Sequence, residues 1–331
     1  MERTDQISGH SLGHFIMEPM WIRLSASRSA HLSRRKSFIL SENSFARGRW
    51  MTHHPEKLIK DLNVIARDLR LDALEIIHER GQGHPGGSLS VAEIIAALYF
   101  HHLKIDPARP EWPERDRFIL SKGHACALLY SALARRGYLS KDELHTWGHL
   151  GGRLQGHPDR LKTPGVDMTT GMEGHGISVG VGLCLAARVR GLGYRVYVLV
   201  GDGECQCGVL WEGAMTASKY GLSDLTVIVD YNGVQLDGPV QEILPLDPLA
   251  EKWRSFNFAT LEINGHDVRQ VLDALDMAGE IHDKPKAIVA HTTKGRGVSF
   301  MENKAKWHGL APNDEEYAQA ISELKEETRH E

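Results

Sequence analysis

The most constraining feature of the sequence is a strand–helix–strand pattern at its centre. Two apolar runs, residues 194–200 and 225–230, have the length and the residue types of buried β-strands. Residues 209–220 lie between them and have the spacing and residue types of a helix. Two strands joined by a helix form a βαβ unit, in which the strands run parallel.

Polar residues follow each strand of this unit. Gly201, Asp202, Gly203 and Glu204 come at the end of the first strand, and Asn232 comes just after the second. Ligands of open parallel sheets bind outside the carboxyl ends of the strands, so we expect Asp202 and Asn232 to point into one crevice. A carboxylate and an amide carbonyl supply hard oxygens to Mg²⁺, which takes phosphate oxygens and water as its other ligands. The alternative is that Asp202 only caps the following helix.

Further elements of the same kinds flank the central unit. We expect strands at 118–120, 260–263 and 287–290, and helices at 56–77, 91–103, 124–133, 176–189, 268–279 and from 315 onward. Strands that alternate with helices predict an α/β fold, with a mainly parallel central sheet and helices on both faces. Ser90 and Glu93 have the spacing of a capping box for the second of these helices. The acidic last helix is expected to be solvated.

The composition is that of a soluble globular protein, with 331 residues of which 41% are hydrophobic and 25% charged. The formal net charge of −4 gives no reason to expect nucleic acid or an anionic membrane as a partner. No apolar stretch approaches the ~18 residues that a membrane span needs. Four cysteines are few for a chain of this length, and they indicate a reducing, cytoplasmic setting rather than a disulfide framework.

The first fifty residues differ from the rest. They carry eight Lys or Arg against four Asp or Glu, are rich in Ser and Arg, and lack a sustained helical or strand period. Their acidic residues argue against a transit peptide, and they lack the apolar core of a secretory signal. We expect residues 1–50 to be a disordered tail or an over-extended start, and residues 51–331 to form the folded domain.

Histidines recur after glycines. Eight of the nineteen histidines do so, at positions 10, 14, 84, 124, 149, 157, 175 and 266. Glycine lets the backbone approach a ligand closely, and an imidazole can move protons near pH 7. His10, His14 and His266 are expected to be surface histidines in ordinary turns. The others lie at expected loop ends of the α/β sheet.

Six short motifs occur in the order found in transketolases, and together they span roughly residues 57–312. They are Gly83-His84-Pro85-Gly86-Gly87, Ser121-Lys122-Gly123-His124-Ala125, Gly156-His157-Pro158, Thr169-Thr170-Gly171, Gly201-Asp202-Gly203 with Asn232, and Trp307-His308-Gly309. The chain therefore resembles the amino-terminal, diphosphate-binding half of a transketolase. Members of that family use thiamine diphosphate to transfer a two-carbon ketol group from a ketose phosphate to an aldose.

The resemblance implies a role for each matching residue. The Mg²⁺ ligands would be Asp202, Asn232 and the backbone carbonyl of Val234. The residues that bind thiamine diphosphate would be His124, Gly171, Met172, Glu173, Gly203, Glu204, Asn232 and His308. The catalytic residues, which bind donor oxygens or move protons around the reacting carbons, would be His84, His157 and His308.

Two features depart from the family pattern. After Thr169-Thr170-Gly171 the family's usual turn reads Pro or Ser, then Leu-Gly-Gln-Gly, but this chain has Met172-Glu173-Gly174-His175-Gly176. Glu173 thus stands where an apolar residue normally packs against the cofactor. The chain also lacks room for the following domain of full-length members, which supplies the cofactor-activating glutamate and groups that grip the substrate phosphate. We therefore expect a partner subunit with a pyrimidine-binding domain, in a heterotetramer or a homodimer that acts on sugar phosphates.

Other functions fit the sequence less well. Within thiamine chemistry, the alternatives are the α subunit of a 2-oxo acid dehydrogenase and a deoxyxylulose phosphate synthase-like fragment; the Gly-His turns and the Trp-His-Gly motif favour transketolase. A nicotinamide dehydrogenase would need a third glycine after Gly201. The absence of any Gly-Lys dipeptide excludes a P-loop, and the absence of His-Glu-x-x-His excludes the common zinc proteases. A non-enzymatic alternative is an orphan half that only binds the cofactor.

Overall fold

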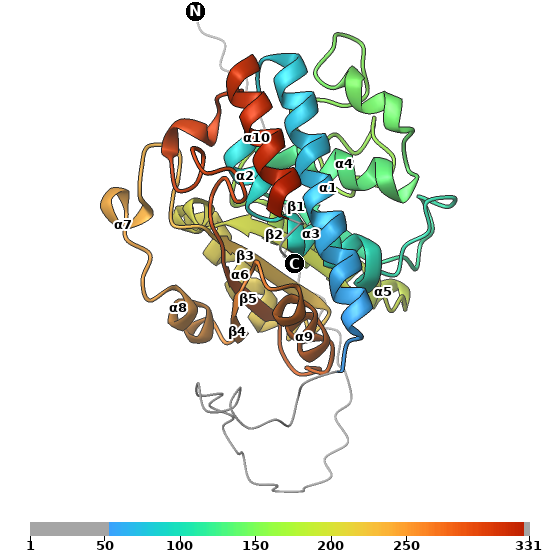
Figure 1. Ribbon diagram of the computed structural model, residues 1–331. Helices are drawn as coiled ribbons and strands as arrows, with labels where there is room; N and C mark the ends of the chain where they lie inside the picture. Colours follow the sequence, from blue (N-terminus) through green and yellow to red (C-terminus); the bar gives the residue numbers. More distant parts are fainter. Residues whose placement is uncertain (1–52, 328–331) are drawn as a thin grey trace, which may run out of the picture. The chain divides into compact units, whose positions relative to one another are not determined.

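A five-stranded, fully parallel sheet lies at the centre of the computed structural model (Figure 1). Its strands are β1 (Arg117–Leu120), β2 (Val196–Gly201), β3 (Leu225–Tyr231), β4 (Ala259–Asn264) and β5 (Lys286–His291), in the order β1-β2-β3-β5-β4. The structure describes residues 53–327, so the expectations for residues 1–50, His10 and His14 lie outside the described residues. The predicted strands are confirmed, and with them the α/β fold.

The two central strands of the predicted βαβ unit are buried on both faces. Every residue of β2 and β3 is buried except the last of each. Helices cover both faces of a parallel sheet, which is why such strands appear in sequence as continuous apolar runs. The register pairs Gly201 with Asp230 and Tyr231 with His291, so the carboxyl ends of β2, β3 and β5 lie side by side.

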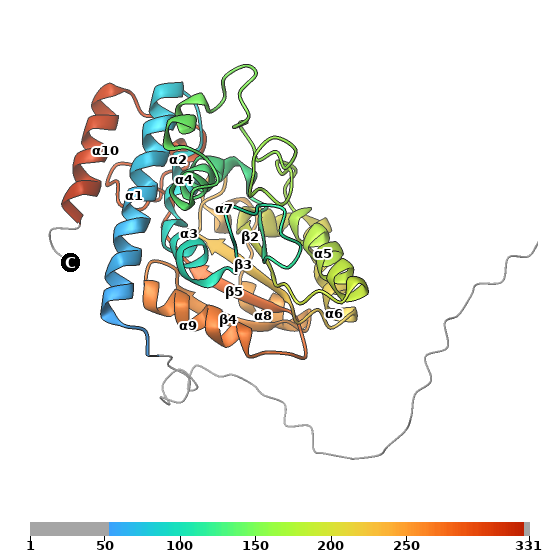
Figure 2. The same cartoon turned by 90° about the vertical axis from the view of Figure 1, so that its right-hand side faces the viewer.

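Helices cover both faces of the sheet (Figure 2). They are α1 (Glu56–Arg80), α2 (Pro85–Leu89), α3 (Ala92–Ala97), α4 (Cys126–Arg136), α5 (Gly176–Arg190), α6 (Gly208–Lys219), α7 (Val240–Ile243), α8 (Leu249–Ser255), α9 (Val268–Gly279) and α10 (Asp314–Glu327). Helices α3 and α9 lie on one side with α1 packed against them, and α5, α6 and α8 pack on the other through a shared apolar core.

Helix α1 places the first Gly-His segment near the sheet. Its apolar face, which includes Leu62, Leu69 and Ile77, is almost completely buried. The helix ends at Gly81, whose φ of +67° is a left-handed conformation that favours glycine. The chain then turns into the short helix α2, which the sequence predicts as a loop.

The predicted capping box is wrong. Helix α3 begins after Val91, and no side chain caps it. Glu93 is instead buried and accepts two hydrogen bonds from Arg70 of α1, at 2.6 and 2.7 Å. Ser90 lies 2.7 Å from a carboxylate oxygen of Asp230 at the end of β3. Both side chains therefore bind residues that are distant in the sequence instead of capping α3.

Helix α10 is more than a solvated surface helix. It packs along α1 (Figure 1), where Ala320 and Leu324 are buried, and Tyr317 stacks on His78 with ring centroids 4.2 Å apart. Its other side is exposed, as the acidic sequence predicts. Among residues 53–327, no helix has both the length and the apolar character needed to cross a membrane.

Candidate active site

The carboxyl ends of four neighbouring strands meet at one edge of the sheet. Residues 121–124 follow β1, residues 201–204 end β2, residues 230–234 end β3, and residues 292–294 follow β5. The short helix α2 approaches the same edge, because the N–H of Gly295 donates to the carbonyl of Gly86 over 2.9 Å. Half of the predicted site residues lie on these segments, namely His124, Asp202, Gly203, Glu204, Asn232 and Val234.

Asp202 lies directly after β2, and only 2% of the residue is exposed. Its Oδ1 accepts the backbone N–H of Gly203 over 2.7 Å, and its Oδ2 accepts that of Gly233 over 2.5 Å. Burial, followed by the negative charge of Asp230, raises the pKa of Asp202 to about 6. A cation bound at this carboxylate would favour its ionised form.

The turn after β3 brings the other two predicted metal ligands to Asp202. Gly233 has a φ of +76°, and its N–H is the donor to Asp202. The Oδ1 atom of Asn232 accepts the N–H of Val234 over 3.1 Å, while its Nδ2 donates to Asp230 over 2.7 Å. Asp202, Asn232 and Val234 are therefore neighbours, and the amide and carbonyl oxygens keep a second lone pair for another ligand.

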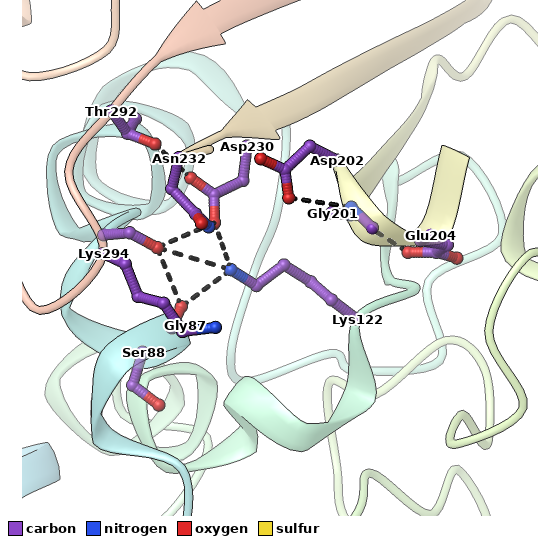
Figure 3. Close-up of polar contacts among 12 residues, drawn as sticks. Gly87, Ser88, Lys122, Gly201, Asp202, Glu204, Asp230, Asn232, Thr292 and Lys294 are labelled. Carbon is purple, nitrogen blue, oxygen red and sulfur yellow. Dashed lines mark hydrogen bonds and ion pairs between the residues drawn. The ribbon is translucent and has the colours of Figure 1, made fainter. Parts of the chain in front are cut away.

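A buried ion pair lies beneath this turn (Figure 3). Nζ of Lys122 lies 2.5 Å from Oδ2 of Asp230, and the two residues are 1% and 0% exposed. Lys122 also donates to the carbonyl of Gly87 over 2.7 Å, and Thr292 donates to Oδ1 of Asp230. Burial alone would raise the pKa of Asp230, but the ammonium of Lys122 and the hydrogen bonds from Lys122, Thr292 and Ser90 together keep that pKa below its ordinary value.

A second buried ammonium belongs to Lys294. Its Nζ donates to the carbonyl of Val234 and contacts Nδ1 of His308, at 2.8 Å in each case. Burial and the charge of Lys122 lower the pKa of Lys294 to about 8. Within residues 53–327 Lys294 forms no ion pair, so its positive charge is compensated only by dipoles and by acidic groups farther away.

Four predicted histidines form one cluster. The ring centroid of His84 lies 5.2 Å from that of His124, 6.4 Å from that of His157 and 5.5 Å from that of His308. The centroids of His124 and His308 are 4.9 Å apart. These side chains come from four segments that are far apart in the sequence, and the fold brings them together.

Most of this cluster is uncharged at neutral pH. Burial lowers the pKa of His84 to about 4 and the pKa of His308 to about 2, and the neighbouring positive groups act in the same direction. Burial also lowers the pKa of His124, although Glu173 opposes the shift. Neutral imidazoles can accept protons, which an acid–base role requires.

The predicted cofactor turn, residues 171–174, lies beside the cluster. Gly171 has a φ of +143°, and a Cβ atom there would lie 3.3 Å from the ring of His157. Met172 is 73% exposed. Oε1 of Glu173 lies 3.2 Å from Nδ1 of His124. The turn therefore presents one apolar side chain to the surface and one carboxylate to the histidines.

Glu204 lies behind this turn rather than in the cluster. It is 1% exposed, accepts the N–H of Gly174 over 2.7 Å and that of Gly201 over 3.1 Å, and also accepts the hydroxyl of Ser121. Burial raises the pKa of Glu204 to about 7. The carboxyl group ties the turn to the end of β2, which is a supporting role.

The sequence analysis assigned no role to Lys122, Asp230 or Lys294. Asp230 carries the clearest signal, because it is a charged residue at the end of an otherwise apolar strand. The prediction that His266 is an ordinary surface histidine is wrong. Its Nδ1 lies 3.1 Å from Oε2 of Glu93, and its Nε2 accepts the N–H of Thr293 over 2.8 Å.

The donor set fits a magnesium-bound diphosphate. Lys294 offers an ammonium that lacks a carboxylate partner among the described residues, while Asp202 offers a carboxylate whose pKa is raised. The first suits an anion and the second a cation. A Cβ atom at Gly203 would lie 2.9 Å from Gln235, and one at Gly87 would lie 3.1 Å from Nε2 of His124, so both positions are closely packed.

Comparisons with known proteins agree with this geometry. The family "Transketolase, thiamine diphosphate binding domain" matches residues 62–329, so the chain belongs to it. The 6-deoxy-6-sulfo-D-fructose transketolase subunit SqwG of Clostridium sp. (strain MSTE9) is 44% identical over 81% of this chain and 97% of that protein. An apulose-4-phosphate transketolase subunit of Phocaeicola vulgatus is 37% identical over 81% of this chain and 95% of that protein.

Solved structures show the same fold. The transketolase of Leishmania mexicana is 34% identical, with a TM-score of 0.76, over 80% of this chain and 41% of that one. The transketolase of Campylobacter jejuni is 30% identical, with a TM-score of 0.75, over 82% of this chain and 43% of that one. The chain thus spans about two-fifths of these transketolases but almost the whole of the relatives that are named as subunits. The predicted family is confirmed.

Proposed function

We propose that this chain is the diphosphate-binding subunit of a two-chain transketolase, which transfers a two-carbon ketol group from a ketose phosphate to an aldose. The observation that carries the proposal is the convergence of an oxygen-ligand set, the buried ammonium of Lys294 and four histidines at the carboxyl edge of one sheet. Two relatives that match this chain over most of their length are named as transketolase subunits.

The residues divide into those that hold the cofactor and those that act on the sugar. Asp202, Asn232 and the carbonyl of Val234 would bind Mg²⁺, and His124, Lys294 and Gly203 would hold the diphosphate. When bound, thiamine diphosphate supplies a nucleophilic carbon and stores the electrons of the broken C–C bond. The role of this chain's residues is to position the donor and to move its protons.

The histidine cluster suits the proton transfers. His84 is half-buried and uncharged at pH 7, so its imidazole can accept a proton from a donor hydroxyl. His157 is exposed beside it, where it can bind sugar oxygens from the solvent side. The Nδ1 atom of His308 accepts from the ammonium of Lys294, so the remaining proton of the neutral ring is on Nε2. That nitrogen can donate to an anionic oxygen.

We infer that a second chain completes the site. Relatives that match this chain over most of their length are named as transketolase subunits, and the match covers 41% and 43% of the two solved transketolases. A partner subunit with a pyrimidine-binding domain would cover the cofactor and supply its activating carboxylate. Met172, which is 73% exposed beside the histidine cluster, suits such a contact. We further propose a heterotetramer, and a cytoplasmic location because the described cysteines are all unpaired thiols.

A reconstitution assay tests the proposal. The chain, its candidate partner, thiamine diphosphate and Mg²⁺ are mixed with xylulose 5-phosphate and ribose 5-phosphate. Sedoheptulose 7-phosphate should form only when both chains are present. Because the relatives are named for other ketoses, 6-deoxy-6-sulfofructose and apulose 4-phosphate should be tested as donors in parallel. Failure of the two-chain mixture to bind the cofactor would refute the proposal.

A further inference from the structure

Glu173 is the residue at which this chain departs most clearly from the transketolase pattern, and the structure gives it a partner. Its carboxylate lies 3.2 Å from Nδ1 of His124, the imidazole proposed to hold the diphosphate. The Glu173 side chain is 39% exposed and that of His124 is 15% exposed. The pair therefore lies where solvent meets the buried polar groups of the site.

The backbone next to Glu173 is closely packed on both sides. Gly174 has a φ of +83°, its N–H is bound by Glu204, and a Cβ atom there would lie 2.7 Å from Val209. On the other side, a Cβ atom at Gly123 would lie 3.0 Å from the backbone nitrogen of Gly171. The turn is therefore closely packed where Glu173 contacts the imidazole.

The contact settles which nitrogen of His124 carries the proton. The hydrogen bond from His124 lowers the pKa of Glu173, so the carboxyl group is ionised at neutral pH and can only accept. Nδ1 of His124 must therefore be the donor. Because burial lowers the pKa of His124, the ring is neutral in the free chain and its Nε2 bears a lone pair.

That lone pair faces Gly87, at the edge of the sheet where the diphosphate is proposed to bind. Nε2 of His124 lies 3.1 Å from the position of a Cβ atom on Gly87, and the His124 ring lies beside those of His84 and His308. An unprotonated nitrogen repels an anionic oxygen. A protonated one donates a charge-assisted hydrogen bond to it, which is among the stronger kinds in proteins.

We propose that Glu173 is a positioning residue that fixes the tautomer of His124 and couples diphosphate binding to the uptake of one proton by that imidazole. The inference rests on the proposed function. Solvent supplies the proton to Nε2, and the imidazolium then lies between two anionic groups, Glu173 on the Nδ1 side and the diphosphate on the Nε2 side. An apolar residue at position 173 would leave the imidazolium with the diphosphate alone.

Other charged groups bear on the same proton. Those that face the pair are Lys122, Lys294, His84, His157 and His308, with Glu204 and Cys207 behind Glu173. The two ammonium groups oppose protonation of His124, and Asp202 is expected to lose a proton when Mg²⁺ binds. The informative quantity is therefore the difference between variants at position 173, because these contributions are common to both.

The experiment compares wild type with Glu173→Gln, which keeps the shape and a hydrogen-bond acceptor but removes the charge. Thiamine diphosphate is titrated into the two-chain complex at saturating Mg²⁺, calorimetrically, in buffers of different ionisation enthalpy. Wild type should take up between half a proton and one proton more than Glu173→Gln. The affinity of the wild-type complex for thiamine diphosphate should fall by up to tenfold per pH unit between pH 6.5 and 8.5. The affinity of the Glu173→Gln complex should fall less steeply. Glu280→Gln is the matched control.

Two results would overturn the inference. Equal proton uptake in wild type and Glu173→Gln would do so while leaving the proposed function intact, whereas failure of the wild-type complex to bind thiamine diphosphate would refute the proposed function itself. Nitrogen-15 NMR of the full chain gives a readout without cofactor. The Nε2 signal of His124, assigned with His124→Gln, should be that of an unprotonated nitrogen, and a protonated Nε2 would contradict the tautomer.

Discussion

The ammonium of Lys294 donates to the carbonyl oxygen of Val234 over 2.8 Å and contacts Nδ1 of His308 over the same distance. One buried cation thus connects a proposed metal ligand to a proposed catalytic histidine. Burial and the charge of Lys122 lower its pKa to about 8, so Lys294 is still mainly charged at neutral pH. An anion that binds beside it would gain a charge-assisted hydrogen bond that solvent screens little.

Lys294→Met should weaken cofactor binding. A hydrogen bond to a charged group contributes roughly 1.5–3 kcal/mol, so the Kd of thiamine diphosphate should rise by roughly tenfold or more. Calorimetry on the two-chain complex at saturating Mg²⁺ measures the change. Lys219→Met, at the exposed end of α6, is the control and should bind as wild type does. An unchanged Kd in Lys294→Met would remove Lys294 from the anion site.

Asp230→Asn should destabilise the fold strongly. It leaves the ammonium of Lys122, which is 1% exposed, without its carboxylate, and breaking such a buried pair costs roughly 3–5 kcal/mol. Urea unfolding of the full chain measures the loss. The double variant with Lys122→Met should lose less than the sum of the two single variants, because the pair is removed together. Strict additivity would mean that the two charges do not interact.

Asp202→Asn should abolish the dependence of cofactor binding on Mg²⁺. In wild type the raised pKa of about 6 means that the carboxyl group is protonated below pH 6 in the metal-free protein. Magnesium affinity should therefore fall up to tenfold per unit as pH decreases below about 6. Magnesium titrations of the complex between pH 5 and 8 test this. Retained magnesium dependence in Asp202→Asn, with Asp283→Asn as control, would contradict the metal assignment.

Glu204 should make the free energy of unfolding of the metal-free chain depend on pH. Its pKa is about 7 in the folded chain against an ordinary value of 4.5, so the folded state binds more protons between these values. The contribution of this group to the free energy of unfolding therefore rises as pH falls from about 8 to about 5, by up to roughly 1.4 kcal/mol per unit. Urea unfolding of wild type and Glu204→Gln across this range measures the slope. Identical slopes would show that Glu204 is not buried as an acid.

His84→Ala should slow turnover without disturbing assembly. General acid–base catalysis by a side chain contributes roughly 10²- to 10⁴-fold, so kcat of the two-chain complex should fall at least 100-fold. The ring is half-buried and supports no secondary structure, so sedimentation of the complex should be unchanged. His282→Ala, an exposed histidine outside the site, provides the comparison. A loss smaller than tenfold would exclude His84 from the proton transfers.

The strands could be predicted because their signal is local. Parallel strands such as β2 and β3 are apolar throughout, and polar residues at their ends must lie at one edge of the sheet. The expectation that Asp202 and Asn232 lie close together follows from that rule alone, and their role as metal ligands stays a proposal. The convergence of His84, His157 and His308 does not, and it was predicted only through the resemblance to transketolases.

The polar network under the site could not be predicted in this way. Asp230 stands out as a charged residue at the end of an apolar strand, but only the fold shows that it pairs with buried Lys122 and that Lys294 is buried as well. The predicted capping box failed for the same reason. Glu93 has the right local spacing, but two partners from distant parts of the sequence, Arg70 and His266, bind its carboxylate in the fold.

The most direct test of the central claim is a crystal structure of the two-chain complex with thiamine diphosphate and Mg²⁺. The account predicts the diphosphate at the carboxyl ends of β2 and β3, with the metal bound by Asp202, Asn232 and the carbonyl of Val234. The thiazolium ring should lie beside the histidine cluster, toward the partner chain. Diphosphate bound away from Asp202 and Lys294, or a cofactor held entirely within the partner, would contradict it.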